Sequence, residues 1–196
     1  ANLPFAGEPD AFEVYARFTP GTAKEDGTEL QGRVQIIMHG DAAYHDPELS
    51  EFDAEKIASA SVLIPATVEW TKFTGEFSYT GNESDKRYLL ASATTNPVPG
   101  ASKDDQLDLD NLKLVYYHAL KNLTFDGAQI EGFSSDKLNY TVEIEGSAKE
   151  AAEKIGYEVK GKGAIVTTVL NDNELEINVI GNDILVNEDS FTTYTV

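Results

Sequence analysis

Apolar and polar residues alternate with a period of two along much of the chain. Such alternating sets cover residues 12–18, 34–38, 73–79, 140–144 and 175–179. Because successive side chains of a strand point to opposite faces, each set predicts a strand with one buried face. Turn-forming residues separate these segments, among them Pro20-Gly21, Gly81-Asn82 and Gly181-Asn182. Many short strands with frequent turns predict an all-β chain that folds into antiparallel β-sandwiches.

Two segments favour helix. Ser147 is a suitable N-cap for residues 147–155, and Glu150 follows three residues later, as in a capping box. A second short helix is expected at residues 47–57, where Pro47 suits a first helical turn. We therefore expect helix to be a minor part of the fold.

The apolar pattern changes phase within residues 107–117. Leu107 and Leu109 share one parity, whereas Leu112, Leu114 and Tyr116 share the other. A β-bulge at Asp110–Asn111 would keep both sets facing inward. A separate apolar pattern begins at residues 120–125, so we expect a boundary near Tyr117–His118 and two domains, residues 1–117 and 118–196.

The charge of the chain narrows the choice of partners. The sequence has 34 acidic and 15 basic residues, a formal net charge of −19, and no cysteine. So acidic a surface repels phosphate groups, which argues against nucleic acids and anionic membranes. The lack of cysteine excludes disulfides, thiolate metal sites and cysteine nucleophiles. No apolar run is long enough to predict a membrane-spanning helix.

Three predicted strands carry aromatic and charged side chains on the face opposite the apolar one. These side chains are Glu13, Tyr15 and Arg17, then Arg33, Gln35 and His39, then Trp70, Lys72 and Glu76. Sugars require this mix, because aromatic rings stack on their C–H faces while planar polar groups hydrogen-bond their hydroxyls.

If these strands are neighbours, they form a glycan-binding face. The residues expected to contact the ligand are Tyr15, Arg17, Gln35, His39, Trp70 and Lys72. The alternative is that Trp70, Tyr15 and His39 are structural. A bulge at Gly75 would also reverse the assumed parity.

Acidic residues near the end of the first half suggest a cation site. Asp104, Asp105, Asp108 and Asp110 cluster there. Ca²⁺ prefers several carboxylate and carbonyl oxygens, so Asp110, at the expected bulge, and Asp108 are the candidate ligands of a structural Ca²⁺. The alternative is ordinary surface charge. Three scattered histidines form no pair with zinc-ligand spacing.

Residues 51–55 read E-F-D-A-E and raise the question of catalysis. This resembles the E-x-D-x-E strand signature of retaining glucanases, in which Glu51 and Glu55 would act as nucleophile and acid/base about 5 Å apart. The motif follows Asp46-Pro47 and lacks flanking β-branched residues. Helix or loop is an equally good prediction, and we favour solvated surface charge.

The first half resembles a known domain family. The carrying motifs are K-I-A-S-A-S-V-L-I at 56–64, V-E-W-T-K-F-T-G-E-F-S-Y at 68–79, R-Y-L-L-A-S-A-T-T-N at 87–96 and L-D-L-D-N-L-K-L-V-Y at 107–116. In this order they resemble the carbohydrate-metabolism jelly-roll domain of surface lipoproteins from gut Gram-negative bacteria. The resemblance spans residues 5–117. It implies a lectin-like sandwich, glycan association and an extracytoplasmic location on the cell surface or in the periplasm, with a lipid anchor upstream of residue 1.

The second half resembles a different domain. Residues 120–144 read L-K-N-L-T-F-D-G-A-Q-I-E-G-F-S-S-D-K-L-N-Y-T-V-E-I, and residues 191–196 read F-T-T-Y-T-V. These segments resemble the opening and closing strands of a cadherin-like, Ig-like β-sandwich of bacterial surface proteins. The resemblance implies a spacer or a module that binds surface-protein partners. The calcium-binding motifs of true cadherins are missing.

Three functions follow from these patterns. We favour a non-catalytic cell-surface protein that binds a polysaccharide or oligosaccharide. An adhesion, assembly or spacer protein without sugar binding is the first alternative. A glycoside hydrolase that uses Glu51 and Glu55 is the second.

Overall fold

The computed structural model describes residues 3–21, 29–40, 44, 50–95, 97, 104–182 and 191–196, without the side chains of residues 51 and 52. Contacts divide the chain into two compact units. Unit 1 comprises Ala1–Ala6 and Ala11–Val115, and unit 2 comprises Gly7–Asp10 and Tyr116–Val196. Nearly all regular structure is β, as the alternating pattern predicts.

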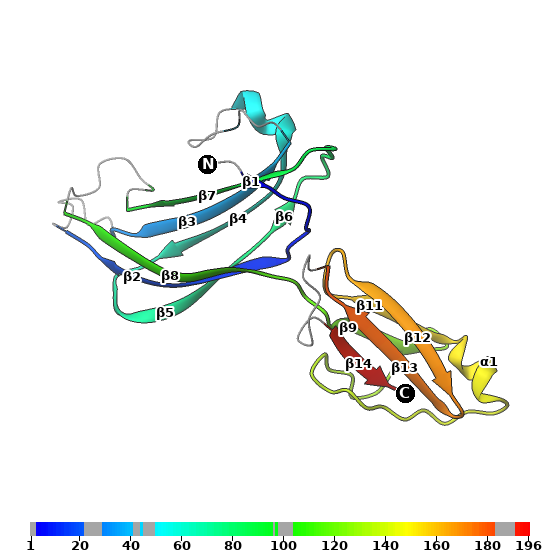
Figure 1. The fold of residues 1–196 in the computed structure, drawn as a ribbon. Coiled ribbons are helices and arrows are strands. Elements are labelled where there is room, and N and C mark those ends of the chain that lie inside the picture. Colours follow the sequence, from blue (N-terminus) through cyan, green and yellow to red (C-terminus); the bar gives the residue numbers. More distant parts are fainter. Residues whose placement is uncertain are drawn as a thin grey trace. The chain divides into compact units, whose positions relative to one another are not determined.

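Unit 1 is a β-sandwich whose two sheets form separate layers (Figure 1). Its strands are β1 (Leu3–Pro4), β2 (Ala11–Thr19), β3 (Gly32–His39), β4 (Lys56–Ile64), β5 (Thr67–Glu76), β6 (Ser78–Tyr79), β7 (Tyr88–Thr94) and β8 (Gln106–Val115). One sheet has the order β1-β7-β3-β4-β6 and the other the order β5-β2-β8. All their pairings are antiparallel.

The core of unit 1 lies between the inner faces of its two sheets. The buried residues are Phe12, Val14, Ala16 and Phe18 of β2, Val34 and Ile36 of β3, and Ala60 and Ile64 of β4. The four β2 residues are the alternating set that the sequence assigned to a buried face. The intervening residues of β2 therefore lie on the outer face of the sandwich.

A bulge interrupts the pairing of β2 with β8 where the sequence predicts it. Glu13 pairs with Lys113 while Tyr15 pairs with Asp110, so β8 carries an extra residue. Asn111 has a φ of 53°, which asparagine tolerates better than most residues. The expectation for the flanking leucines is only partly correct. Leu107 and Leu114 pack against the core, but Leu109 and Leu112 are exposed on this edge strand.

Gly75 is required for a close approach rather than for a bulge. It pairs regularly with Phe12 across the β2–β5 ladder. A Cβ atom at this position would lie 2.8 Å from Cζ of Phe12 and closer still to Cε1. Phe12 is fully buried, so its ring has little room to move aside.

Unit 2 is a second β-sandwich. It contains β9 (Leu120–Phe125), β10 (Ala128–Gln129), α1 (Ala148–Ala152), β11 (Ile155–Val159), β12 (Ile165–Asn171), β13 (Glu174–Ile180) and β14 (Phe191–Thr195). Its sheets have the orders β10-β9-β11 and β12-β13-β14. Leu120, Leu123, Leu175, Ile177, Val179 and Tyr194 are among the residues of its core.

The two predicted helices are present in shortened form. Ser147 Oγ accepts a hydrogen bond from Glu150 N, and Ser147 N donates to Glu150 Oε2, each at 3.3 Å. The backbone hydrogen bond from Ser147 holds the pKa of Glu150 below its usual value. The second helix is a 3₁₀ helix, η1 (Ser50–Glu55), and Pro47 lies outside the described residues. No helix in the described ranges is long and apolar enough to cross a membrane.

Residues 140–144 do not form the predicted strand. A single parallel bridge joins Asn139 to Thr195, with Tyr140 N donating to Thr195 O at 2.9 Å. Tyr140 is buried, Val142 is half-buried and Ile144 is exposed. The alternation therefore marks an extended segment with one inward face, but not a strand in a continuous ladder.

The Tyr194 hydroxyl joins two distant segments of unit 2. It accepts a hydrogen bond from Leu120 N at 3.0 Å and donates one to Ser135 O at 2.7 Å. Burial raises the pKa of Tyr194, which keeps the phenol protonated and able to donate. This hydroxyl thereby supplies a partner to a buried backbone amide at the start of β9.

We expect Gly75→Ala to destabilise the protein by about 1–3 kcal/mol, because the added methyl group forces the buried Phe12 ring to move. Urea unfolding followed by circular dichroism measures the change. Thr74→Ala, an exposed neighbour on β5, is the control and should change little. Equal stability of Gly75→Ala and the wild type would show that the core can accommodate the clash.

We expect Tyr194→Phe to cost about 1–3 kcal/mol, because it leaves Leu120 N buried without a hydrogen-bond partner. The same unfolding measurement applies. Tyr157→Phe removes the hydroxyl of an exposed tyrosine on β11 and is the matched control. A similar small loss in both variants would argue against a structural role for the Tyr194 hydroxyl.

Candidate functional site

The outer face of the β5-β2-β8 sheet brings together four of the six predicted ligand-binding residues. Tyr15 pairs with Lys72 across the β2–β5 ladder. The same ladder shifts register between Ala16 and Phe18, and the guanidinium of Arg17 lies over the ring of Trp70, 5.0 Å from its centroid. Tyr15 and Arg17 alternate with core residues of β2, so they face away from the sandwich interior, and Trp70 and Lys72 are exposed beside them.

Both aromatic rings of this face are exposed. Trp70 retains 44% of its accessible surface and Tyr15 retains 39%. Neither residue belongs to the core of unit 1. Trp70 therefore lies at the surface of the edge strand β5 and not in the core. The guanidinium of Arg17 lies over the indole, and part of the residue stays open to solvent.

One ion-pair group fixes Arg17. Its Nε donates to Asp108 Oδ2 at 2.8 Å, and Gln106 Nε2 donates to Asp108 Oδ1 at 2.9 Å. These hydrogen bonds, from Gln106 first and then Arg17, hold the pKa of Asp108 below its usual value. The guanidinium is thus held between a carboxylate and an indole ring.

A second group surrounds Glu13 on the same face. Lys113 Nζ and Lys72 Nζ each lie 3.0 Å from one of its carboxylate oxygens. The two ammonium groups, Lys113 first, hold the pKa of Glu13 below its usual value of 4.5. Because Glu13 lies on the central strand, it links the charges of β5 and β8 across β2.

This outer face is suited to a polar ligand that has apolar patches. Two exposed rings supply stacking surfaces, while guanidinium, ammonium and carboxylate groups beside them supply donors and acceptors. The ion pairs orient these groups before a ligand arrives, which lowers the entropic cost of binding. A hollow of about 360 Å³ adjoins the Trp70 end, lined in part by Thr67, Val68 and Glu69.

Gln35 and His39 do not belong to this face, so their predicted place in the site is wrong. Both lie on β3, in the other sheet of unit 1, with exposures of 8% and 0%. The His39 ring stacks on Tyr44 at 4.5 Å and on Tyr88 at 5.7 Å between centroids. β2 and β3 are consecutive in the chain but belong to different layers. The apolar run 36–38 was the signal that both faces of β3 are covered.

Two residues of the site were missed by the sequence reasoning. Lys113 binds Glu13 and Gln106 binds Asp108, and both come from β8. The predicted bulge at Asp110–Asn111 could have identified Lys113, because it sets which β8 side chains face outward. That inference also required knowing that β8 pairs with β2.

The donor set around Asp108 does not fit the predicted Ca²⁺ site. Both of its carboxylate oxygens already accept hydrogen bonds, one of them from a cation. Asp110 is exposed and pairs with Tyr15 in the ladder. Within the ranges that the structure describes, no three or more acidic or histidine side chains are grouped so that they could hold a metal. We assign Asp108 instead to the positioning of Arg17.

The geometry also argues against the predicted carboxylate pair of Glu51 and Glu55. These residues lie in η1 and not in a strand. The E-x-D-x-E signature relies on the two-residue period of a strand, and a 3₁₀ helix, with three residues per turn, lacks that period. The alternative expectation of helical structure is confirmed. The side chain of Glu51 lies outside the described residues.

Comparisons with known proteins add little to this description. No family model matches the chain, and no curated protein matches it. Among solved structures, a protein from Bacteroides thetaiotaomicron described as a "putative glycoside hydrolase" is similar, with a TM-score of 0.47 and 18% identity. The match covers 59% of this chain and 40% of the other. So distant a likeness carries no argument about activity.

We expect Glu13→Gln to lower stability near neutral pH by about 0.5–1 kcal/mol, the range of exposed ion pairs. A carboxylate whose pKa is depressed in the folded state stabilises the fold above its unfolded pKa. This contribution is lost as pH falls through the folded pKa. The difference between wild type and variant should therefore shrink in acid.

Urea unfolding at a series of pH values measures this difference. The control is Glu69→Gln, which removes the charge of a carboxylate on the neighbouring strand β5. It should show no such trend. A Glu13→Gln deficit that stays constant with pH would contradict the electrostatic explanation.

Proposed function

We propose that the outer face of the β5-β2-β8 sheet binds a polysaccharide or oligosaccharide without cleaving it. The observation that carries this proposal is the pair of exposed rings, Trp70 and Tyr15, set among charged groups that are already held in place. A tryptophan left 44% exposed on a sheet surface contributes only part of its apolar area to the fold. Stacking on a ligand would bury the apolar area that remains exposed.

The neighbours of the rings favour a sugar over a protein partner. The centres of protein interfaces are depleted of lysine, glutamate and aspartate. Here Lys72 pairs with Tyr15 across the ladder, and its ammonium group binds Glu13. A sugar ring, with its apolar C–H face and its polar rim, matches this intermixing more closely than an apolar protein surface does.

Each residue has a distinct part in this proposal. Trp70 and Tyr15 stack on sugar rings. Arg17 and Lys72 donate hydrogen bonds to hydroxyl groups, while Asp108 and Glu13 hold those two cations in position. The hollow beside Thr67 and Val68 would accommodate a further part of the ligand beyond Trp70.

Two other functions, a spacer or adhesion role and glycoside hydrolysis, fit the structure less well than glycan binding does. A spacer or adhesion protein without sugar binding needs no exposed Trp70, although surface-protein partners remain compatible with unit 2. Hydrolysis by Glu51 and Glu55 requires the strand of the E-x-D-x-E signature, whereas both residues lie in η1. An extracytoplasmic, lipid-anchored location at the cell surface stays a prediction and is tested by cell fractionation.

The decisive experiment is a binding screen against a broad panel of soluble and insoluble polysaccharides. We expect Trp70→Ala to weaken binding about tenfold or more, equivalent to about 1.4 kcal/mol. Tyr157→Ala removes an exposed aromatic ring from unit 2 and is the matched control, with unchanged binding. Circular dichroism confirms that both variants fold.

Two outcomes would overturn the proposal. The first is that the folded wild-type protein binds none of the polysaccharides in the panel, which favours the adhesion or spacer function. The second is binding that Trp70→Ala leaves intact, which places the site elsewhere on the chain.

A further inference from the structure

The strand β12 forms an open edge of unit 2. Its sheet has the order β12-β13-β14, so within the described part of the chain β12 pairs with β13 alone (Figure 1). The pairs from Ile165↔Ile180 to Asn171↔Glu174 follow one another without a register shift. A regular strand at the end of a sheet presents one row of backbone groups to which another strand can bond.

The hairpin between β12 and β13 shows which backbone groups form this row. Two residues separate Asn171 from Glu174, which pair with each other. In a two-residue hairpin the residues that flank the loop exchange both backbone hydrogen bonds, and bonding then alternates along the strand. Asn171 and every second residue before it therefore bond β13. The N–H and C=O groups of Val166, Thr168 and Leu170 point away from the sheet.

The side chains of β12 do not protect this edge. The strand reads I-V-T-T-V-L-N and has no charged residue, in a chain whose formal net charge is −19. Ile165, Val169 and Leu170 are large hydrophobic residues that are nevertheless exposed. Edge strands usually carry charges, proline or a bulge that prevents pairing with another chain. Since β12 has none of these, its chemistry favours a further strand as its neighbour.

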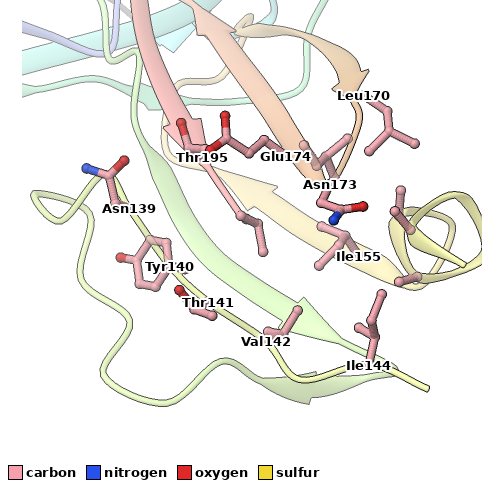
Figure 2. Close-up of a pocket in the computed structure, with 15 residues that line it drawn as sticks. Asn139, Tyr140, Thr141, Val142, Ile144, Ile155, Leu170, Asn173, Glu174 and Thr195 are labelled. Carbon is pink, nitrogen blue, oxygen red and sulfur yellow. The ribbon is translucent and has the colours of Figure 1, made fainter. Parts of the chain in front are cut away.

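Successive side chains of β12 alternate between the two faces of the sheet. Val166 packs against the core of unit 2, and Leu170 lines a pocket of about 440 Å³, near Asn173 at the turn of the hairpin (Figure 2). Even-numbered residues of β12 therefore lie on the inner face, and odd-numbered residues such as Val169 lie on the outer face. A partner strand has to match both faces at once.

A second copy of β12 matches this edge when it runs antiparallel with Thr168 opposite Thr168. Val166 of one copy then lies opposite Leu170 of the other, and every outward N–H group meets an outward carbonyl group. A shift of the register by two residues in either direction would leave some of these groups without a partner. The edge is therefore self-complementary in one register.

The side chains of such a pair are also compatible. On the inner face Thr168 lies opposite Thr168, and Val166 lies opposite Leu170. On the outer face Thr167 lies opposite Val169. Cross-strand pairs of threonines and of β-branched residues stabilise sheets, and no like charges face each other here.

We propose that the open edge of β12 pairs with β12 of a second copy of this chain, antiparallel and centred on Thr168. The β12-β13-β14 sheets of the two copies become one continuous sheet across a two-fold axis. Both copies use the same surface, so this contact closes at a dimer. One strand pair buries little surface, so the dimer should be weak, with a dissociation constant of about 0.1 mM. The interaction is independent of the glycan proposal, because all its residues belong to unit 2.

Sedimentation equilibrium of the full chain measures this association, over protein concentrations from about 10 µM to 1 mM. We expect a monomer–dimer equilibrium that salt strengthens, because salt screens the repulsion between two acidic copies. A chain that stays monomeric at the highest concentration overturns the proposal.

A charge placed at the two-fold axis tests the register. Thr168→Lys and Thr168→Glu each set like charges directly opposite one another, and each should weaken dimerisation about tenfold or more. An equimolar mixture of the two variants sets opposite charges there and should restore dimers that contain one copy of each.

Thr74→Lys and Thr74→Glu are the matched controls, at an exposed strand position in unit 1, and should dimerise like the wild type. Circular dichroism confirms that all four variants fold. The proposed pairing is wrong if the Thr168 variants dimerise as well as the wild type. It is also wrong if both are weakened and their mixture does not recover.

Hydrogen exchange of the wild type provides a second readout. The amides of Thr167 and Val169 bond β13 and should be protected at every protein concentration. The outward amides of Val166, Thr168 and Leu170 should exchange fast in dilute protein and slowly at about 1 mM, where the dimer forms. Slow exchange of these three amides in dilute protein would show that the edge is already covered in the monomer, and would overturn the proposal.

Discussion

The register of β2 against β5 and β8 determines which of its side chains are buried in the core of unit 1 and which are exposed on the outer face. β2 is the central strand of a three-stranded sheet, so each of its residues faces either the core or the outer surface. A slip of one residue would move Phe12 and Val14 to solvent and turn Tyr15 and Arg17 inward. The burial of one set therefore fixes the exposure of the other. The candidate site exists because the core is packed in this register.

The sequence predicts those features that depend on periodicity and local chemistry. The all-β character, the alternating buried residues of β2 and the capping box at Ser147 are all present. The bulge at Asp110–Asn111 is also where the phase change places it. Each feature leaves a signal within a few adjacent residues. Period, turn chemistry and capping residues therefore suffice to find them.

The sequence does not reveal which strands become neighbours. Alternation shows that β3 has an inward face, but not that it pairs with β4 and β7 instead of β2. This is why Gln35 and His39 were wrongly placed beside Tyr15. The segment 140–144 failed for a related reason, since an alternating pattern reports a buried face and not a hydrogen-bonded partner. The Gly75 contact with Phe12 likewise depends on a pairing far apart in sequence.

The contact between Arg17 and Trp70 also has a spectroscopic consequence. Trp70 is the single tryptophan of the chain. Its indole stands partly in solvent, next to a guanidinium group. The tryptophan emission of the whole protein therefore originates from one spot on unit 1, and its wavelength and intensity depend on the polarity and charge there. Unit 2 contributes no indole signal, so the two sandwiches are optically distinguishable without any label.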